Sequence, residues 1–384
     1  MLAKQGKYFI IGAGKFQYNF IKTANKMGLE THVFDKDKNA IGKEFAFKFY
    51  PISIFEKEEI LKIAQKEKPV GIHAVANEQG NITACYVGEN LGLISNSYET
   101  ALNTTNKIKM KKICKIKNIL TPIHYEFKNI DEIDLKRISL PVIVKPSDRS
   151  AGRGVKLVDD ENQLEIAASE ALEYSFDKKF IIEEYIDFDQ YSLETITHNG
   201  RHDLVAITKM HFNGPPDFVE NFHFMPPKIN KNLFDKIKKF TSFVLDSFNI
   251  LCGACHIEVR IDKDNKIYLI EIASRLGGWR DWMTEAAFSY NYCESIINTS
   301  LGEKYIDPTI KTKRKLSISR HILYEEDYIK YFNILKKYND RIYVSLVEKK
   351  KPINTGAKNL VETDGPYILS INEEERDYFI NYLN

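Results

Sequence analysis

The chain has 384 residues, of which 43% are hydrophobic and 28% are charged, and its formal net charge is +2. This length and composition predict a globular protein of two or three domains. The near-neutral charge argues against nucleic acid and membrane partners, since either would be attracted by an excess of positive charge. The sequence contains neither a signal-peptide core nor a stretch long enough to span a membrane, so we expect a cytoplasmic protein.

The first hundred residues predict alternating strands and helices. Residues 7–12 form an apolar run that ends in a glycine turn, and a helix is expected over about 16–27. A second strand ends at Asp35, and the alternation continues to a short strand at 93–95. Because such alternation produces a parallel sheet with helices on both faces, we expect residues 1–105 to form a Rossmann-like domain.

The glycine turn contains part of a dinucleotide-binding fingerprint. Gly12 and Gly14 have the expected spacing, but the third glycine position holds Gln17. Asp35 stands where such proteins place the acid that binds the ribose. A tight turn between a strand and a helix explains the two glycines equally well, so both interpretations stay open.

A different pattern begins near residue 106. A β-branched strand ends at Lys145, and a loop with two glycines follows at 148–154. The proline-rich segment 214–227 is expected to be a loop before the chain enters a final hairpin of charged and apolar residues. The helices expected in this part of the chain cover about 107–117, 161–174 and 232–248.

Charged side chains occupy one face of the hairpin HIEVRIDKDNKIYLIEIA. His256, Glu258 and Arg260 alternate along its first strand, and Glu271 lies on the return strand. The two acids can converge, and close carboxylates repel each other unless a cation lies between them. Hard oxygen ligands favour Mg²⁺ that is shared with phosphate oxygens. Arg275 follows the second acid and can bind a phosphate or a carboxylate with two N–H groups.

Two upstream segments contain residue types that suit a nucleotide. Lys145 places a positive charge at a strand end, and the glycines between Ser150 and Gly154 let backbone N–H groups approach phosphates closely. The residues EEYI at 183–186 lie where a strand runs into a loop, and backbone groups there can bind the edge of an adenine. Each feature alone is typical of an ordinary surface charge or turn, so the hypothesis depends on their order.

Together and in this order, these segments resemble the ATP-grasp superfamily over residues 7–300. The first domain resembles the one that precedes the ATP-binding part of biotin carboxylase and of the purine-pathway ATP-grasp carboxylases. The stretch GACHIEVRID…YLIEIASRLGG resembles the L-amino-acid ligases and their carboxylate–amine ligase relatives. The resemblance implies two α+β subdomains that grip ATP at 106–305, with a mobile lid at about 140–185, and a small C-terminal α+β region at 306–384.

The resemblance also implies roles for individual residues. Two lysines and the glycine-rich lid loop are expected to bind ATP phosphates, a strand end to bind adenine, and Gln190 to bind the ribose. The implied ATP-binding residues are Lys107, Lys145, Ser150, Gly152, Arg153, Gly154, Glu183, Glu184, Tyr185, Ile186 and Gln190, and the implied metal ligands are Glu258 and Glu271. The candidates for holding the carboxylate and the acyl phosphate are Arg275, Arg260, Arg280 and Lys209; for Arg260 and Lys209 a structural ion pair is equally expected.

Three residues depart from the pattern of the superfamily, and one of them is Phe188, which replaces a frequent glycine in the ribose loop. Ala273 replaces an asparagine that often provides a further metal ligand, and Ser274 is expected to point to the other face of the strand. Gln190 replaces a glutamate, so it can bind a ribose hydroxyl only without charge assistance. These changes leave the number of bound metal ions open.

The resemblance implies an ATP-dependent carboxylate–amine ligase that forms an amide through an acyl phosphate and uses Mg²⁺, with Mn²⁺ as an alternative. Its expected partners are ATP, a carboxylate and an amine, one of them an amino acid, and a homodimer is a further expectation. A small-molecule kinase on the same scaffold, an NAD-dependent oxidoreductase and an inactive ATP-binding scaffold are the alternatives.

The segment Cys252-Gly-Ala-Cys255-His256 has the spacing of a c-type haem attachment site. Strict alternation from His256 onward predicts a strand, whereas haem attachment needs a helix or a loop that can surround the porphyrin. We find no second pair of ligands for zinc. Cys252 and Cys255 are therefore expected to be small buried residues.

Overall fold

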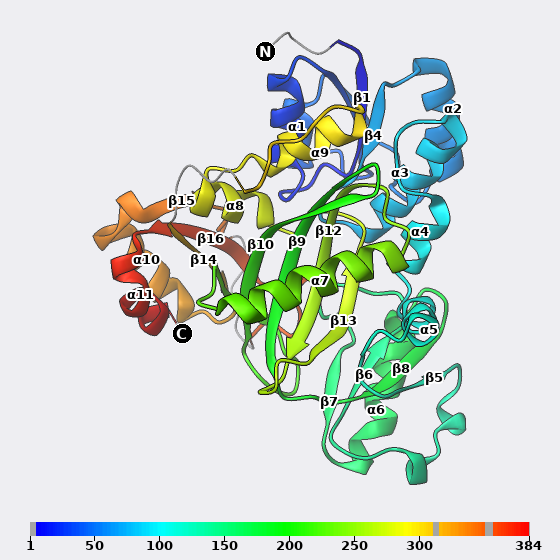
Figure 1. The fold of residues 1–384 in the computed structure, drawn as a ribbon, viewed down its shortest axis with the longest axis vertical. Coiled ribbons are helices and arrows are strands. Elements are labelled where there is room, and N and C mark those ends of the chain that lie inside the picture. The colour runs from blue at the N-terminus through cyan, green and yellow to red at the C-terminus, as the bar shows by residue number, and fades with distance from the viewer. Residues whose placement is uncertain (1–4, 310–314, 350–355, 384) are drawn as a thin grey trace.

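The computed structural model describes residues 5–309, 315–349 and 356–383, and in this part of the chain the strands form three sheets (Figure 1). The N-terminal domain contains a parallel sheet in the order β3-β2-β1-β4. Helices cover this sheet, as the alternating pattern predicts. Its elements are β1 Lys7–Ile11, α1 Tyr18–Lys26, β2 Glu30–Phe34, β3 Lys48–Tyr50, α2 Lys57–Glu67, β4 Gly71–His73, α3 Glu78–Leu91 and α4 Tyr98–Asn103.

A second, smaller body lies below the centre of the molecule in Figure 1 and contains residues 140–185, so we call it the lid. Its antiparallel sheet has the order β5-β8-β6-β7, and α6 packs on it through Leu164, Ala168 and Ala171. The helix α5 connects this body to the rest of the chain. The elements are α5 Lys107–Lys117, β5 His124–Phe127, β6 Val142–Pro146, β7 Lys156–Val158, α6 Glu161–Tyr174 and β8 Phe180–Glu184.

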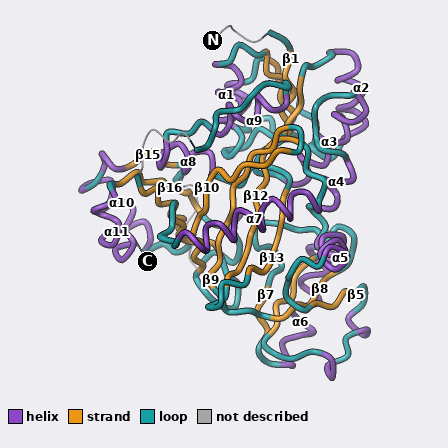
Figure 2. Tube along the Cα trace, in the orientation of Figure 1, coloured by secondary structure: helices purple, strands orange, loops and turns teal. Residues whose placement is uncertain are grey.

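The central sheet is antiparallel and has the order β13-β12-β9-β10-β11-β14-β16-β15. The tube in Figure 2 shows α7 lying along the long strands of this sheet, and α8 and α9 lie near the N-terminal domain. The elements are β9 Asp189–His198, β10 Arg201–Phe212, β11 Glu220–Met225, α7 Lys231–Ser247, β12 Cys252–Ile261, β13 Ile267–Ala273, α8 Arg280–Phe288, α9 Tyr292–Ser300, β14 Leu316–Ile322, α10 Asp327–Lys337, β15 Ile342–Ser345, β16 Asp364–Ile371 and α11 Arg376–Leu383.

Three features differ from the sequence-based expectations. Residues 93–95 form an irregular loop with a bend at Ile94, and the fourth strand of the first sheet is the short edge strand β3. The proline-rich segment 214–227 contains β11, whose prolines lie outside the strand, where they disturb no ladder hydrogen bond. The strands after residue 306 continue the central sheet through β11–β14 pairing, so this region shares a sheet with the ATP-binding part.

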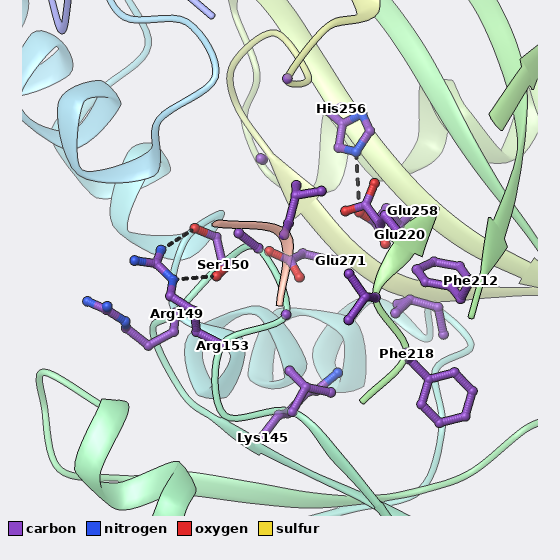
Figure 3. Close-up of a pocket in the computed structure, with 18 of the residues that line it drawn as sticks. Lys145, Arg149, Ser150, Arg153, Phe212, Phe218, Glu220, His256, Glu258 and Glu271 are labelled. Atoms are coloured by element: carbon purple, nitrogen blue, oxygen red, sulfur yellow. Dashed lines mark hydrogen bonds and ion pairs between the residues drawn. The ribbon is translucent and has the colours of Figure 1, made fainter. Parts of the chain in front are cut away.

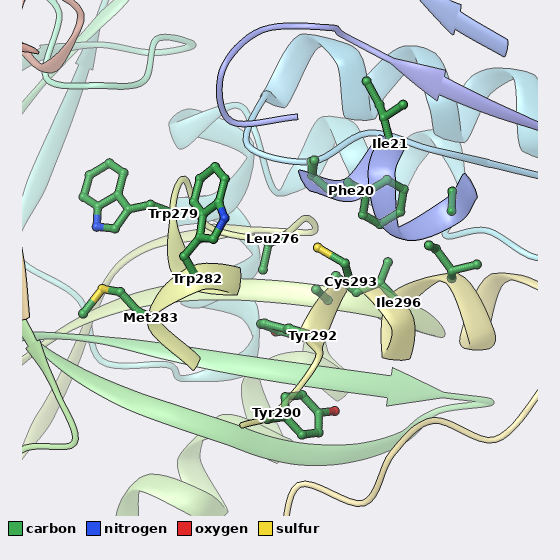
Figure 4. Close-up of a cluster of buried hydrophobic side chains, with 14 of the residues drawn as sticks. Phe20, Ile21, Leu276, Trp279, Trp282, Met283, Tyr290, Tyr292, Cys293 and Ile296 are labelled. Atoms are coloured by element: carbon green, nitrogen blue, oxygen red, sulfur yellow. The ribbon is translucent and has the colours of Figure 1, made fainter. Parts of the chain in front are cut away.

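The largest hydrophobic core joins the N-terminal domain to the central sheet. Phe20 and Ile21 of α1 lie opposite Cys293 and Ile296 of α9, and Trp282 packs in the same cluster (Figure 4). Burying side chains of this size contributes about 1.5–3 kcal/mol each. This shared core holds the two bodies in a defined relation, and the cavity described next lies between them.

Candidate active site

A cavity of about 490 Å³ has walls from the N-terminal domain, the lid, the central sheet and the segment before β16 (Figure 3). The structure brings to this cavity every site residue expected from the sequence except Gly154 and Lys209. The expected residues that line it are Lys107, Lys145, Ser150, Gly152, Arg153, Glu183, Glu184, Tyr185, Ile186, Gln190, Glu258, Arg260, Glu271, Arg275 and Arg280.

Two buried lysines share one buried glutamate at the lid side of the cavity. Lys145 of β6 and Lys111 of α5 both form ion pairs with Glu183 of β8, the second with an N–O distance of 3.0 Å. Burial alone would raise the pKa of Glu183, but the two ammonium groups outweigh it and lower the pKa to about 2. The Glu183 side chain is thus committed to the lysines, and only the backbone of the expected adenine-binding segment is available to a nucleotide.

Lys111 is a functional candidate that the sequence reasoning missed. A lysine-rich helix predicts lysines in solvent, yet Lys111 is fully buried, and Lys107 is 4% exposed. The two residues are one helical turn apart, so they lie on the same face of α5. That spacing is the signal that could have identified Lys111.

The glycine-rich loop is folded over this end of the cavity. Lys107 donates to the carbonyl oxygen of Arg149 at 2.7 Å and lies 3.4 Å from a carboxylate oxygen of Glu271. Arg153 donates from Nε to the Ser150 carbonyl oxygen at 2.9 Å and from a terminal nitrogen to the Ser150 hydroxyl at 3.2 Å. Lys107 therefore connects the loop to the acid-bearing hairpin.

Gly154 does not line the cavity. This position requires glycine because neighbouring side chains leave no room for a Cβ. Its φ is +69°, and an added Cβ would lie 2.9 Å from the Tyr174 ring and 3.0 Å from Pro146. We expect Gly154→Ala to lower the free energy of unfolding by about 2–4 kcal/mol, the sum of left-handed strain and overpacking. Gly152→Ala is the matched control, because Gly152 has a φ of +71° and open space around its Cβ position, so only about 1–2 kcal/mol is expected. Equal losses in urea titrations of the two variants would contradict this account.

Polar side chains on one face of the central sheet form the opposite wall. Strand β9 places Gln190, Ser192 and Glu194 directly beside Arg260, Glu258 and His256 of β12. Glu258 is in turn the direct partner of Glu271 on β13. The register shifts immediately after this pair, so β13 carries an extra residue, a local irregularity of the kind found near active sites. The alternation predicted from the sequence thus produces one continuous charged face.

The carboxylates on this face fit a Mg²⁺ ion that also binds phosphate. Glu258 accepts from Gln190 Nε2 at 2.8 Å and lies 3.3 Å from His256 Nε2, which leaves further lone pairs on both oxygens. Among the residues that the structure describes, no group of three or more His, Cys, Asp or Glu side chains could hold a metal by itself. Phosphate oxygens would have to complete the coordination, as Mg²⁺ sites commonly require. Ala273 lines the cavity, while Ser274 bonds to Asn81 and Thr104 on the other side of the strand, as expected.

Glu220 of β11 is a third carboxylate that the sequence reasoning missed. Figure 3 places it beside Glu258. Burial, and next the charge of Glu258, raise the pKa of Glu220 to about 7. His223 lies 3.4 Å from Glu220 through Nε2 and 2.9 Å from Arg280 through Nδ1. The alternating aromatic residues of ENFHFM were the available signal for this strand, and the flanking prolines obscured it.

Arg280 lies at the centre of the buried polar network. It is 2% exposed, lies 3.3 Å from Glu194 and donates to the Ser192 hydroxyl at 3.2 Å. Glu194 also pairs with His256 at 2.7 Å. Arg280 therefore brings positive charge to the wall that holds Glu194, Glu220, Glu258 and Glu271.

Arg260 contacts the segment expected to bind adenine. It donates to the Ile186 carbonyl oxygen and to Gln190 Oε1, and its guanidinium group lies over the Tyr185 ring. The N–H groups of Glu184 and Tyr185 donate to the carbonyl oxygens of Ile123 and Pro141. Among the described residues, no protein acceptor takes the N–H of Ile186, so this group is available to a ligand. Arg260 therefore supports this segment through hydrogen bonds and a cation–π contact.

Arg275 joins the hairpin to the N-terminal domain. Its guanidinium group forms an ion pair with Glu78, the first residue of α3, and donates to the Leu276 carbonyl oxygen. Burial would raise the pKa of Glu78, but Arg275 outweighs it and lowers the pKa to about 2. No local pattern identifies Glu78, since its partner is almost two hundred residues away in the chain.

Lys209 does not reach the cavity. Its ammonium group pairs with Asp189 and lies 4.6 Å from the centre of the Tyr191 ring. Its position on β10 directs the side chain to these neighbours, so Lys209 forms the structural ion pair that was expected equally with substrate binding.

The remaining motifs have structural explanations. Asp35 accepts from the N–H of Ala13 at 2.9 Å, and Gln17 donates to the Val75 carbonyl oxygen, so these side chains stabilise the glycine turn. Cys252 and Cys255 are free, buried residues of β12, which confirms the expectation drawn from the alternation. None of the described helices is both long and apolar enough to cross a membrane.

Comparison with known proteins identifies a domain within the chain. The model of the family described as "ATP-grasp domain" matches residues 138–282. A formate-dependent phosphoribosylglycinamide formyltransferase of Sulfurisphaera tokodaii is 25% identical over 83% of this chain and 80% of its own length. A D-alanine–D-alanine ligase of Thermosipho africanus is 30% identical over 53% of this chain and 58% of its own.

Solved structures agree on the fold. An L-amino acid ligase from Bacillus licheniformis superposes with a TM-score of 0.81, covering 100% of this chain and 98% of its own at 19% identity. An N5-carboxyaminoimidazole synthetase from Staphylococcus aureus, solved with ADP, has a TM-score of 0.78 and 18% identity, covering 98% and 97% of the two chains. Residues 138–282 of the chain thus form an ATP-grasp domain, which bears out the resemblance found in its sequence.

Proposed function

We propose that the protein is an ATP-dependent carboxylate–amine ligase that releases ADP and phosphate. The observation that carries this proposal is the direct pairing of Glu258 with Glu271 in the same cavity as Lys107 and Lys145. Acids at one end and buried cations at the other provide what a magnesium–ATP complex needs. The names of relatives, which include two amino acid ligases, favour a ligase over a kinase.

At one end of the cavity, the lid and the expected adenine-binding segment 183–186 would bind ATP. Lys107 and Lys145 bring positive charge to the phosphate groups, and Glu183 holds Lys145 in place. The Ile186 N–H would bind the adenine edge, and Gln190 would bind the ribose. Glu258 and Glu271 would hold Mg²⁺, which would neutralise phosphate charge when bound.

At the other end of the cavity, arginines would bind the substrate carboxylate and the acyl phosphate. A carboxylate oxygen attacks the γ-phosphorus of ATP, the bond to the β–γ bridging oxygen breaks, and ADP leaves. An amine nitrogen then attacks the acyl carbon, phosphate leaves with the C–O electron pair, and the nitrogen loses a proton to give the amide. Arg275 and Arg280 lie on the cavity wall where they can bind the carboxylate and the acyl phosphate. Positioning and charge stabilisation are the main contributions of such a site.

An amino acid as one substrate follows from the ligases among the relatives, and it suits a cavity with both arginines and buried acids. The aromatic and apolar lining residues near Glu220 suit a small apolar side chain on that substrate; they include Phe16, Phe212, Phe218, Val219 and Trp279. A cytoplasmic location and a homodimer stay predictions from the sequence.

The test is ADP release with Mg-ATP against pooled amino acids and small carboxylates, each with and without an added amine. We expect ADP formation that requires both a carboxylate and an amine, with an amide detected by mass spectrometry. A stable phosphorylated product without an amine requirement would instead make the protein a kinase. Absence of ADP formation in all pools, with intact ATP binding, would contradict catalysis by this site.

A further inference from the structure

The segment between β15 and β16 reaches the cavity from a part of the chain outside the matched ATP-grasp domain. Leu360, Val361, Thr363 and Gly365 line the cavity together with the glycine-rich loop. Figure 3 shows this segment, in the salmon colour of the C-terminal part, passing between Ser150 and Glu271. We call residues 357–365 the C-terminal strap.

The strap binds one carbonyl group of the glycine-rich loop. The N–H of Leu360 donates to the Ala151 carbonyl oxygen at 3.1 Å. Lys107 and Arg153 occupy the preceding carbonyl oxygens, those of Arg149 and Ser150. Among the described residues, no protein acceptor takes the N–H groups of residues 150–154. With its carbonyl groups engaged by donors, the loop keeps its N–H groups available for anionic oxygens.

The strap is itself anchored on both sides of Leu360. Ala357 donates to the Leu323 carbonyl oxygen at 2.9 Å, and the Thr363 hydroxyl lies 2.9 Å from His321 Nδ1. Lys15 of the N-terminal domain donates to the Gly365 carbonyl oxygen at 2.7 Å. The side chain of Asn359 accepts from the N–H of Val361 and donates to Glu362, which stabilises the short turn of 3-10 helix at 360–362. The donor that meets Ala151 is therefore held in a defined place.

We propose that the C-terminal strap positions the glycine-rich loop for phosphate binding, with the backbone N–H of Leu360 as the positioning group. The inference rests on the proposed function, in which this loop binds the phosphates of ATP. It assigns a role in ATP binding to the C-terminal region, which joins the central sheet but supplies no other candidate for the reaction.

Leu360→Pro tests this role because proline has no backbone N–H to donate to the Ala151 carbonyl oxygen. Proline suits the first residue of a helical turn, and the extended conformation of Asn359 (φ −155°, ψ 169°) is compatible with a following proline. Leu360→Ala is the matched control, since it keeps the N–H and removes the side chain. We expect the KM for ATP of Leu360→Pro to be about five- to tenfold higher than that of Leu360→Ala, the effect of one lost hydrogen bond. Trypsin should also cleave after Arg149 and Arg153 faster in Leu360→Pro than in Leu360→Ala when no nucleotide is present.

Each outcome decides the question. An unchanged KM and unchanged cleavage in a folded Leu360→Pro variant would overturn the proposal, and so would equal changes in the proline and alanine variants. If Leu360→Pro does not fold, Asn359→Ala, which weakens the strap from outside the loop, should raise the same KM. A wild-type protein that does not turn over ATP would instead count against the proposed function. The role of the strap is tested separately, by comparing variants that bind ATP.

Discussion

Replacing Glu271 with alanine is expected to reduce ATP turnover by about 10²–10³-fold while the protein stays folded. The magnitude is that of losing one group that stabilises charge at the reacting centre. Glu271 faces Glu258 across the hairpin and lies 3.4 Å from Lys107, so its loss removes negative charge where Mg²⁺ and phosphate would meet. Its side chain is 24% exposed, so stability should change little.

The matched control for this prediction is Asp264→Ala. Asp264 is an exposed carboxylate in the turn of the same hairpin and does not line the cavity. Steady-state ADP release and thermal unfolding of both variants provide the comparison. Turnover by Glu271→Ala within a factor of two of the Asp264→Ala value would show that the paired carboxylates are not the metal site.

Replacing Glu183 with glutamine is expected to lower the free energy of unfolding by about 3–5 kcal/mol, the cost of leaving buried charge without its partner. The amide keeps the size of the side chain but removes the negative charge between Lys111 and Lys145. Lys145 would then be free to lose its proton or move, so the KM for ATP should rise as well. Glu184→Gln is the control for stability, because Glu184 is exposed on the same strand, and its effect should stay within about 0.5 kcal/mol.

The ion pairs of Glu183 with Lys111 and Lys145 also predict that the stability of the protein falls at acid pH. The pKa of Glu183 is about 2 in the folded protein, below the ordinary value of 4.5. A lowered folded pKa stabilises the protein above the unfolded pKa, and this contribution is lost as the pH falls from about 4.5 toward 2. Urea unfolding across this range should therefore show a steeper loss for the wild type than for Glu183→Gln. Parallel curves would mean that Glu183 has an ordinary pKa.

Local sequence patterns were sufficient to predict many residues of the candidate site. The alternation of His256, Glu258 and Arg260 predicted a strand with one polar face, and the structure confirms that strand and its pairing with Glu271. The helix expected at 161–174 has those bounds in the structure. Such features depend on side-chain periods of two or 3.6 residues, which a sequence displays directly.

Only the tertiary structure decided which charges meet. Lys111 and Glu183, and Glu78 and Arg275, are far apart in the chain, so no periodicity relates them, and their burial reverses the usual preference of these residue types for solvent. Glu220 was hidden because the prolines around β11 predict a loop, and a strand's place in a sheet depends on its neighbours. The strap reaches the glycine-rich loop only because β14–β16 continue the central sheet past β11. The residue types that bind ATP could be inferred from sequence, whereas their counter-charges and supports required long-range contacts.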